Sequence, residues 1–220
     1  MSASQSEATA TSGPDDEAAG QDFYVFPASR AQKRMYFLQE LAGDASTYHV
    51  PLFYTLTGAV DEQALREAAQ GLVDRHEALR TRFAVRDGEL LQLVSPESRV
   101  EWRVEDVADD DAAVERWVRR ESDRPFDLLA GPLFRVALLR RSARKSVLLV
   151  DTHHIVTDGW STGIILAELS RGYASRVAGA PDGQEPPGGA VRGLLRMAGR
   201  VAGQRGRPPP GTLLAGAARR

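Results

Sequence analysis

The hydrophobic pattern between residues 21 and 175 predicts a mixture of helices and strands. Apolar positions recur at helical spacing in four stretches: Ser29–Leu41, Asp61–Asp74, Asp111–Glu121 and Trp160–Tyr173. Strands are predicted where apolar and β-branched residues run together: Pro51–Leu56, Thr81–Val85, Leu90–Val94, Val100–Val104, Leu133–Leu139 and Val147–Thr152. Strands and helices do not alternate strictly, so the pattern favours an α+β or mixed layered domain over a doubly wound sheet.

Two local signals refine this expectation. Asp87-Gly88 lies between two predicted strands and is typical of a tight hairpin turn. The stretch Val147–Thr152 is apolar at successive positions, which indicates a central strand buried on both faces.

The aromatic residues define where a core can form. All 15 of them lie between Phe23 and Tyr173. Residues 1–20 have no large apolar group beyond Met1, so they are expected to be a disordered leader. Residues 176–220 are rich in Gly, Arg and Pro and are expected to be a disordered tail, with a weak helical run over Val191–Val201. The folded unit is therefore predicted to span residues 21–175.

Composition excludes several classes of function. The formal net charge of the 220 residues is -2, so no basic field indicates a nucleic-acid partner. The chain has no cysteine, which removes disulfides, thiolate metal sites and cysteine nucleophiles. No apolar run is long enough to span a membrane and no secretory signal is recognisable, so a cytoplasmic location is expected.

The residues with most chemical potential follow the buried strand, in the segment Asp151–Ser161. His153 and His154 stand next to each other at the strand end, so only one of them can face a given cleft. An imidazole is well suited to accept a proton near neutral pH. Asp158 could orient this loop or pair with an arginine, and Gly159 could allow close backbone approach or a positive φ. Residue types alone leave a catalytic, a structural and a metal-binding role open, although a metal would need a further ligand from elsewhere.

Three segments in order resemble signature motifs of nonribosomal peptide synthetase condensation domains. They are Ser29–Leu38 (SxAQxRxxxL), Arg75–Phe83 (RHExLRTxF) and His153–Gly159 (HHxxxDG). We call them the first, second and third motifs. The stretches Pro125–Leu128 and Gly131–Phe134 are also similar to that family, and the resemblance extends from about Phe26 to Tyr173.

The resemblance implies a chloramphenicol-acetyltransferase-like fold, of which this chain supplies the N-terminal lobe, with the active site in a groove between two lobes. In the family reaction, an amine on one carrier-bound thioester attacks a second carrier-bound acyl or peptidyl thioester to form an amide. The substrates ride on phosphopantetheine arms of carrier proteins, and no cofactor or metal is expected on this chain itself.

The resemblance also assigns roles to individual residues. His154 matches the catalytic histidine, which takes the amine's proton or holds the amine and stabilises developing charge. His153 is expected to point into the structure. Asp158 is expected to form an ion pair that shapes the site, with Arg75 as the candidate partner and Arg80 as a weaker candidate. Loss of one member of a deeply buried pair would cost about 3–5 kcal/mol.

The resemblance stops near Tyr173, and the family's YxDYxxW motif and second lobe are absent as written. Codons permitted for Ala190–Gly199, read one base later, can spell Gln-Tyr-Ala-Asp-Tyr-Ser-Gly-Trp-Gln. We therefore hypothesise a frameshift between about Val177 and Gly189, and we expect the isolated chain to have little or no condensation activity. The alternatives are an epimerisation domain, a stand-alone ester-forming acyltransferase, a non-catalytic module that docks carrier proteins, and a pseudogene product.

Overall fold

In the computed structural model of the chain, residues 23–42, 48–179 and 199–200 are described. The predicted leader over residues 1–20 and most of the predicted tail lie outside them.

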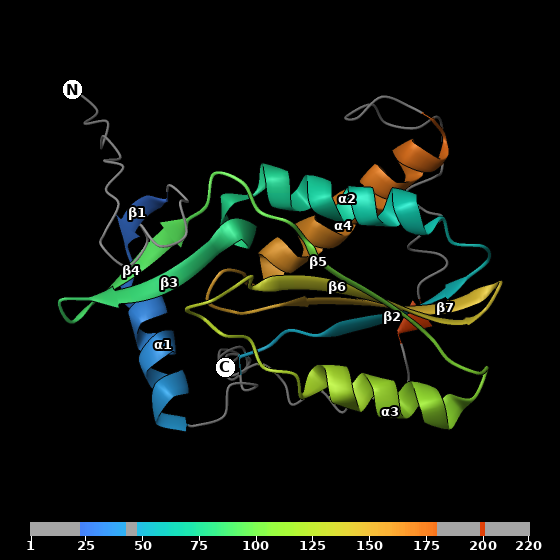
Figure 1. The fold of residues 1–220 in the computed structure, drawn as a ribbon, viewed down its shortest axis with the longest axis horizontal. Helices are drawn as coiled ribbons and strands as arrows, with labels where there is room; N and C mark the ends of the chain where they lie inside the picture. The colour runs from blue at the N-terminus through green and yellow to red at the C-terminus, as the bar shows by residue number, and fades with distance from the viewer. Residues whose placement is uncertain (1–22, 43–47, 180–198, 201–220) are drawn as a thin grey trace, which may run out of the picture.

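The strands form two sheets (Figure 1). The smaller sheet has the order β1-β4-β3 and the larger has the order β5-β6-β7-β2-β8. Their bounds are β1 Tyr24–Pro27, β2 Leu52–Thr57, β3 Thr81–Arg86, β4 Glu89–Val94, β5 Glu101–Asp106, β6 Phe134–Ser142, β7 Lys145–Thr152 and β8 Gly199–Arg200. Neighbouring strands pair antiparallel, except that β5 runs parallel to β6.

The helices cover both faces of the larger sheet (Figure 1). They are α1 Arg30–Ala42, α2 Glu62–Arg75, α3 Asp111–Ser122 and α4 Gly159–Val177, with a short 3-10 turn, η1, at Glu77–Arg80. Helices α2 and α4 pack on one face of the sheet and α3 on the other, while α1 lies beside the smaller sheet.

Alternation along the central strands explains this layering. On β7, Leu148 and Val150 belong to the core under α2 and α4, whereas Val147 and Leu149 belong to the core under α3. Successive side chains of a strand point to opposite faces, so a strand covered on both faces is apolar throughout. The prediction of a buried central strand at Val147–Thr152 is therefore confirmed.

Local signals set most element boundaries. The Ser29 hydroxyl accepts from the Gln32 N–H at 3.2 Å, and the Gln32 amide oxygen accepts from the Ser29 N–H at 2.8 Å, a reciprocal cap at the start of α1. In the hairpin between β3 and β4, Asp87 and Gly88 both have positive φ, 52° and 78°.

Three features differ from the sequence-based expectations. Strand β1 was not predicted. Helix α4 continues to Val177, two residues beyond the expected boundary at residue 175. Gly199–Arg200 pairs with Tyr54 and Thr55 of β2 as a short strand, where the pattern predicted a helical run.

Candidate active site

The third motif forms the connection between β7 and α4. Strand β7 ends at Thr152, and His153 forms an isolated antiparallel bridge with His49. The His154 N–H donates to the carbonyl of Tyr48 at 2.9 Å. Asp158 then caps α4, so the loop is held by a strand on one side and a helix start on the other.

His154 is half-buried and its ring is held in one tautomer. Its Nδ1 lies 3.0 Å from the carbonyl oxygen of Thr157. A carbonyl can only accept, so Nδ1 carries a hydrogen, and in the neutral ring Nε2 is then the nitrogen with the free lone pair. Within the described residues Nε2 has no hydrogen-bond partner.

His153 points the opposite way and is completely buried. Its Nε2 donates to Gln39 Oε1 at 2.7 Å, and its Nδ1 accepts from the Ile155 N–H at 3.0 Å. Burial, aided by the neighbouring imidazoles of His49 and His154, lowers the pKa of His153 to about 3. His153 is therefore neutral at physiological pH, with both ring nitrogens occupied.

Helix α1 holds this loop through two glutamines, Gln32 of the first motif and Gln39 directly after that motif. Gln39 holds His153, and the Gln32 side-chain amide donates to the Ile155 carbonyl at 3.3 Å and to Gln92 at 2.8 Å. Gln39 is not among the residues predicted from the sequence to serve the site. A glutamine at helical spacing on an otherwise apolar face is the signal that could have indicated it.

Asp158 and Arg75 do not form the predicted ion pair. The Asp158 carboxylate accepts from the Ser161 N–H at 2.7 Å, and bonding to Ser161 lowers the pKa of this exposed aspartate. Arg75 lies 3.3 Å from Glu168 on α4, and its side chain is 61% exposed. Glu168 is ten residues after Asp158, which is about 15 Å along a helix, so one arginine at the end of α2 cannot serve both. Because the Arg75 side chain is largely exposed, the predicted cost of about 3–5 kcal/mol for breaking a deeply buried pair does not apply to it.

The two remaining candidates act locally. The Arg80 guanidinium donates to the carbonyls of Ser95 at 2.6 Å and Pro96 at 3.2 Å, so it braces η1 against the end of β4. Gly159 starts α4 without a positive φ, and a Cβ placed there would meet no described atom within 4 Å. The chain's own packing therefore does not require glycine at position 159, and the suggestion of a positive φ is wrong.

A buried ion pair that was not predicted lies two residues before the histidines. Arg135 of β6 and Asp151 of β7 are 2% and 0% exposed, and Arg135 Nη2 lies 2.6 Å from Asp151 Oδ2. Burial raises the pKa of Asp151 to about 6, because its lost hydration outweighs the attraction of Arg135. The signal was present in the sequence as opposite charges inside two adjacent apolar strands.

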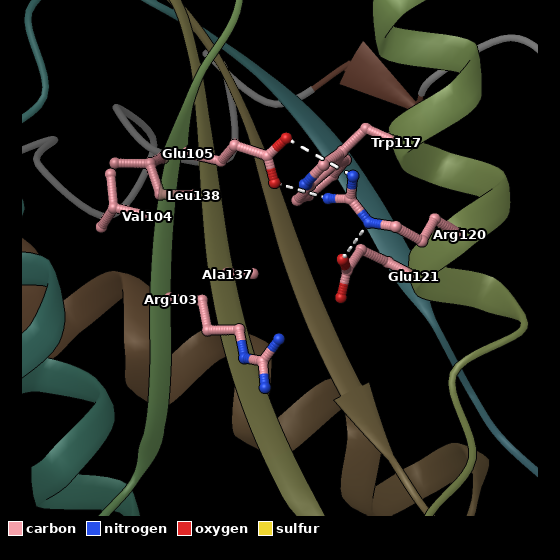
Figure 2. Close-up of a pocket in the computed structure, with 8 residues that line it drawn as sticks. All are labelled: Arg103, Val104, Glu105, Trp117, Arg120, Glu121, Ala137 and Leu138. Atoms are coloured by element: carbon pink, nitrogen blue, oxygen red, sulfur yellow. Dashed lines mark hydrogen bonds and ion pairs between the residues drawn. The ribbon is translucent and has the colours of Figure 1, made fainter.

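Two cavities in the described part of the chain lie away from the histidines. One, of about 360 Å³, lies between β5, β6 and α3, where Arg120 contacts both Glu105 and Glu121 (Figure 2). The other, of about 650 Å³, is lined by residues that include Asp109 and Arg141. Neither is lined by His154. The described residues also contain no group of three His, Asp or Glu side chains placed to hold a metal ion.

Comparison with known proteins identifies the family. A condensation-domain family model matches residues 21–187, so the chain belongs to the condensation-domain family. The chain is 40% identical over 156 residues to malpinin synthetase of Mortierella alpina, covering 70% of this chain and 2% of that protein. It is 40% identical over 151 residues to surfactin synthase subunit 1 of Bacillus subtilis (strain 168), covering 68% of this chain and 4% of that protein.

The fold agrees with this assignment. The starter condensation domain of rhizomide synthetase superimposes with a TM-score of 0.67 at 25% identity, covering 73% of this chain and 40% of that structure. The chain thus spans less than half of the solved domain and a few per cent of the synthetases. The predicted α+β fold, the N-terminal lobe of a chloramphenicol-acetyltransferase-like domain, is confirmed. Among the described helices, none is long and apolar enough to cross a membrane.

Proposed function

We propose that this chain supplies the histidine-bearing lobe of a domain that forms an amide bond between two carrier-bound thioesters in nonribosomal peptide synthesis. The observation that carries the proposal is the state of His154. Its Nδ1–H is committed to the Thr157 carbonyl, and its Nε2 has no partner among the described residues. A half-buried imidazole held in this tautomer suits proton acceptance from an incoming amine.

The chemistry assigned to His154 balances as follows. The amine nitrogen of the acceptor attacks the thioester carbonyl of the donor, a C–N bond forms, and Nε2 takes the proton that the nitrogen loses. The C–S bond then breaks, and the carrier thiolate leaves and receives that proton. The Thr157 carbonyl stabilises the imidazolium while it carries the charge. If His154 instead only orients the amine, the same hydrogen bond fixes the direction of Nε2.

Gly159, five residues after His154, leaves the start of α4 without a side chain. The open space around its missing side chain belongs to no described residue. A thioester arm that passes the start of α4 would use that space, and a larger side chain would obstruct it.

The partners follow from the surface of the lobe. Large apolar side chains stand exposed on α1 and at the start of α4: Phe37 is 61%, Leu41 68% and Trp160 81% exposed. Such exposure is typical of surfaces that meet another protein element. We propose that a second lobe covers part of this surface to complete the groove, and that carrier proteins of adjacent synthetase modules deliver the substrates.

The test is to join this lobe to the second lobe of a related condensation domain and to measure single-turnover amide formation with two loaded carrier proteins. His154→Ala is expected to reduce the rate by about 10²-fold or more, with carrier binding unchanged. His76→Ala is the matched control, because His76 is a partly exposed histidine that contacts Glu168 instead of the third motif. Undiminished turnover in His154→Ala would contradict the proposal. If the joined two-lobe protein without substitutions (the hybrid domain) binds carriers but forms no amide, the result would favour a non-catalytic module that docks carrier proteins.

We also propose that the reading frame changes between about Val177 and Gly189. The family match ends at residue 187, inside this interval, which supports the proposal. Sequencing the gene tests it. Codons for Ala190–Gly199 that spell the YxDYxxW pattern one base later are expected, and codons that cannot spell it would refute the frameshift.

A further inference from the structure

The buried pair formed by Arg135 and Asp151 lies two residues before the histidines. The two residues are directly opposite in the β6–β7 register, and Asp151 Oδ2 accepts from Arg135 Nε at 2.9 Å. Both side chains are essentially inaccessible. Apolar residues of similar volume are often as stable as a buried ion pair. Stability alone therefore does not account for a charged pair at this position.

Arg135 does more than neutralise Asp151. Its Nη2 donates to the Arg124 carbonyl at 2.5 Å and to the Glu121 carbonyl at 3.4 Å, and its Nη1 donates to the Pro125 carbonyl at 3.3 Å. These carbonyls belong to the last turn of α3 and the segment that follows it. One planar guanidinium thus ties the end of β7 to the chain leaving α3, a set of contacts that a lysine ammonium cannot reproduce.

The same guanidinium also sets the position of Phe126. Its central carbon lies 4.2 Å from the centre of the Phe126 ring. That ring packs edge-on against His49 at 4.8 Å and His153 at 6.2 Å, and the Phe126 N–H donates to His49 Nε2 at 3.2 Å. A continuous set of contacts therefore runs from Arg135 through Phe126 to the buried imidazole whose chain neighbour is His154.

We propose that the Arg135–Asp151 pair is a positioning element for the reaction, which fixes the strand end and the aromatic layer under His153 so that His154 keeps its bond to Thr157. Neither residue touches the reacting atoms. Both act through His153, which is buried on this layer, while His154 faces away from it. The consequence for catalysis rests on the proposed function, whereas the structural coupling does not.

The experiment replaces the pair by apolar residues in the full 220-residue chain. In the double variant Arg135→Met with Asp151→Leu no buried charge is left unpaired. The readout is the protonation of each ring nitrogen, measured by ¹⁵N NMR of the four histidines. We expect His154 to lose its Nδ1–H form in favour of a mixture with the Nε2–H form, with His76 unchanged. The matched control is Arg140→Met with Asp106→Leu, which removes an exposed pair farther along β6 and should leave every histidine signal in place.

A second variant keeps the inference testable if the double variant does not fold. Phe126→Leu leaves the ion pair in place and interrupts its contact with His49 and His153, so the His154 signals should again change. Unchanged His154 tautomers in whichever variant folds would overturn the proposal, even if thermal stability falls. In the hybrid domain, the double variant is expected to lower kcat more than KM. The two proposals can fail separately. If the double variant changes the His154 tautomer but the unsubstituted hybrid domain forms no amide, the proposed function is refuted and the positioning role stands.

Discussion

The burial of His153 makes a quantitative prediction about how stability depends on pH. The perturbation is His153→Gln, which removes the titrating imidazole and keeps a side chain able to reach Gln39. In the folded protein the pKa of His153 is about 3, whereas an unfolded histidine has a pKa of about 6.5. Between these values the unfolded state binds a proton that the folded state does not. The contribution of His153 to the free energy of unfolding is therefore fully present above pH 6.5 and is lost as the pH falls toward 3.

The magnitude follows from about 1.4 kcal/mol for each unit of pKa difference. Between pH 6.5 and pH 4.5 the contribution of His153 should fall by about 2 kcal/mol. Asp151 works in the opposite direction, because its folded pKa of about 6 lies above the unfolded value of about 3.9. Its contribution is complete below pH 3.9 and is lost as the pH rises to 6. In the wild-type chain the two residues largely offset each other between pH 4 and 6.

The assay therefore compares the free energies of unfolding of wild type and variant at each pH, so that the contribution of Asp151, which both proteins share, cancels. We expect His153→Gln to be less stable by about 2 kcal/mol at pH 7, because its hydrogen bonds are disturbed. The variant should equal or exceed wild type at pH 4.5, as measured by urea unfolding followed by circular dichroism. Gln39→Leu is the control, since it removes a partner of His153 and keeps the imidazole, so its difference from wild type should not shrink on acidification. A stability difference between wild type and His153→Gln that is constant with pH would refute the neutral, buried state of His153.

Three further predictions concern the loop and its surroundings. Arg75→Ala should cost about 1 kcal/mol or less in urea unfolding, because the Arg75 side chain is 61% exposed and Glu168 keeps its contact with His76. Asp158→Ala should cost about 1 kcal/mol because it removes a helix cap. In the double variant the two costs should add. A coupling energy above about 0.5 kcal/mol between the two substitutions would instead indicate that Arg75 and Asp158 interact. Thr157→Val should cost about 1–3 kcal/mol in the same assay, because the buried Thr157 hydroxyl bonds within the loop, and Thr157→Ser should recover most of it. Gly159→Ala should leave stability within about 1 kcal/mol of wild type while slowing amide formation in the hybrid domain; an unchanged rate would argue against an arm passing there.

Much of the fold was predictable because its signals are local. Capping residues and apolar spacing set the helices to within a few residues, as for the predicted Asp61–Asp74 and the observed Glu62–Arg75. Strand β1 was missed because its burial pattern shows no clear alternation and its partner, β4, lies far along the chain. Pairing over such a distance leaves no periodicity in a four-residue segment.

The candidate site was predictable only in part. Alternation along a strand was enough to predict that His153 and His154 face opposite ways. The proposed partner of Arg75 was wrong because sequence does not reveal which turn of α4 the end of α2 meets, and that turn carries Glu168. Buried polar partners such as Gln39 and Arg135 depend on how α1 and β6 meet the loop, which only the three-dimensional arrangement provides.

The most direct test of the account asks whether the lobe becomes active only when its groove is completed. Amide formation from two loaded carrier proteins should be measured with the 220-residue chain alone and with the same lobe joined to a second lobe. We predict no product above the uncatalysed background for the chain alone and steady product formation for the joined form. Product from the chain alone, or none from a folded joined domain that binds both carriers, would contradict the account.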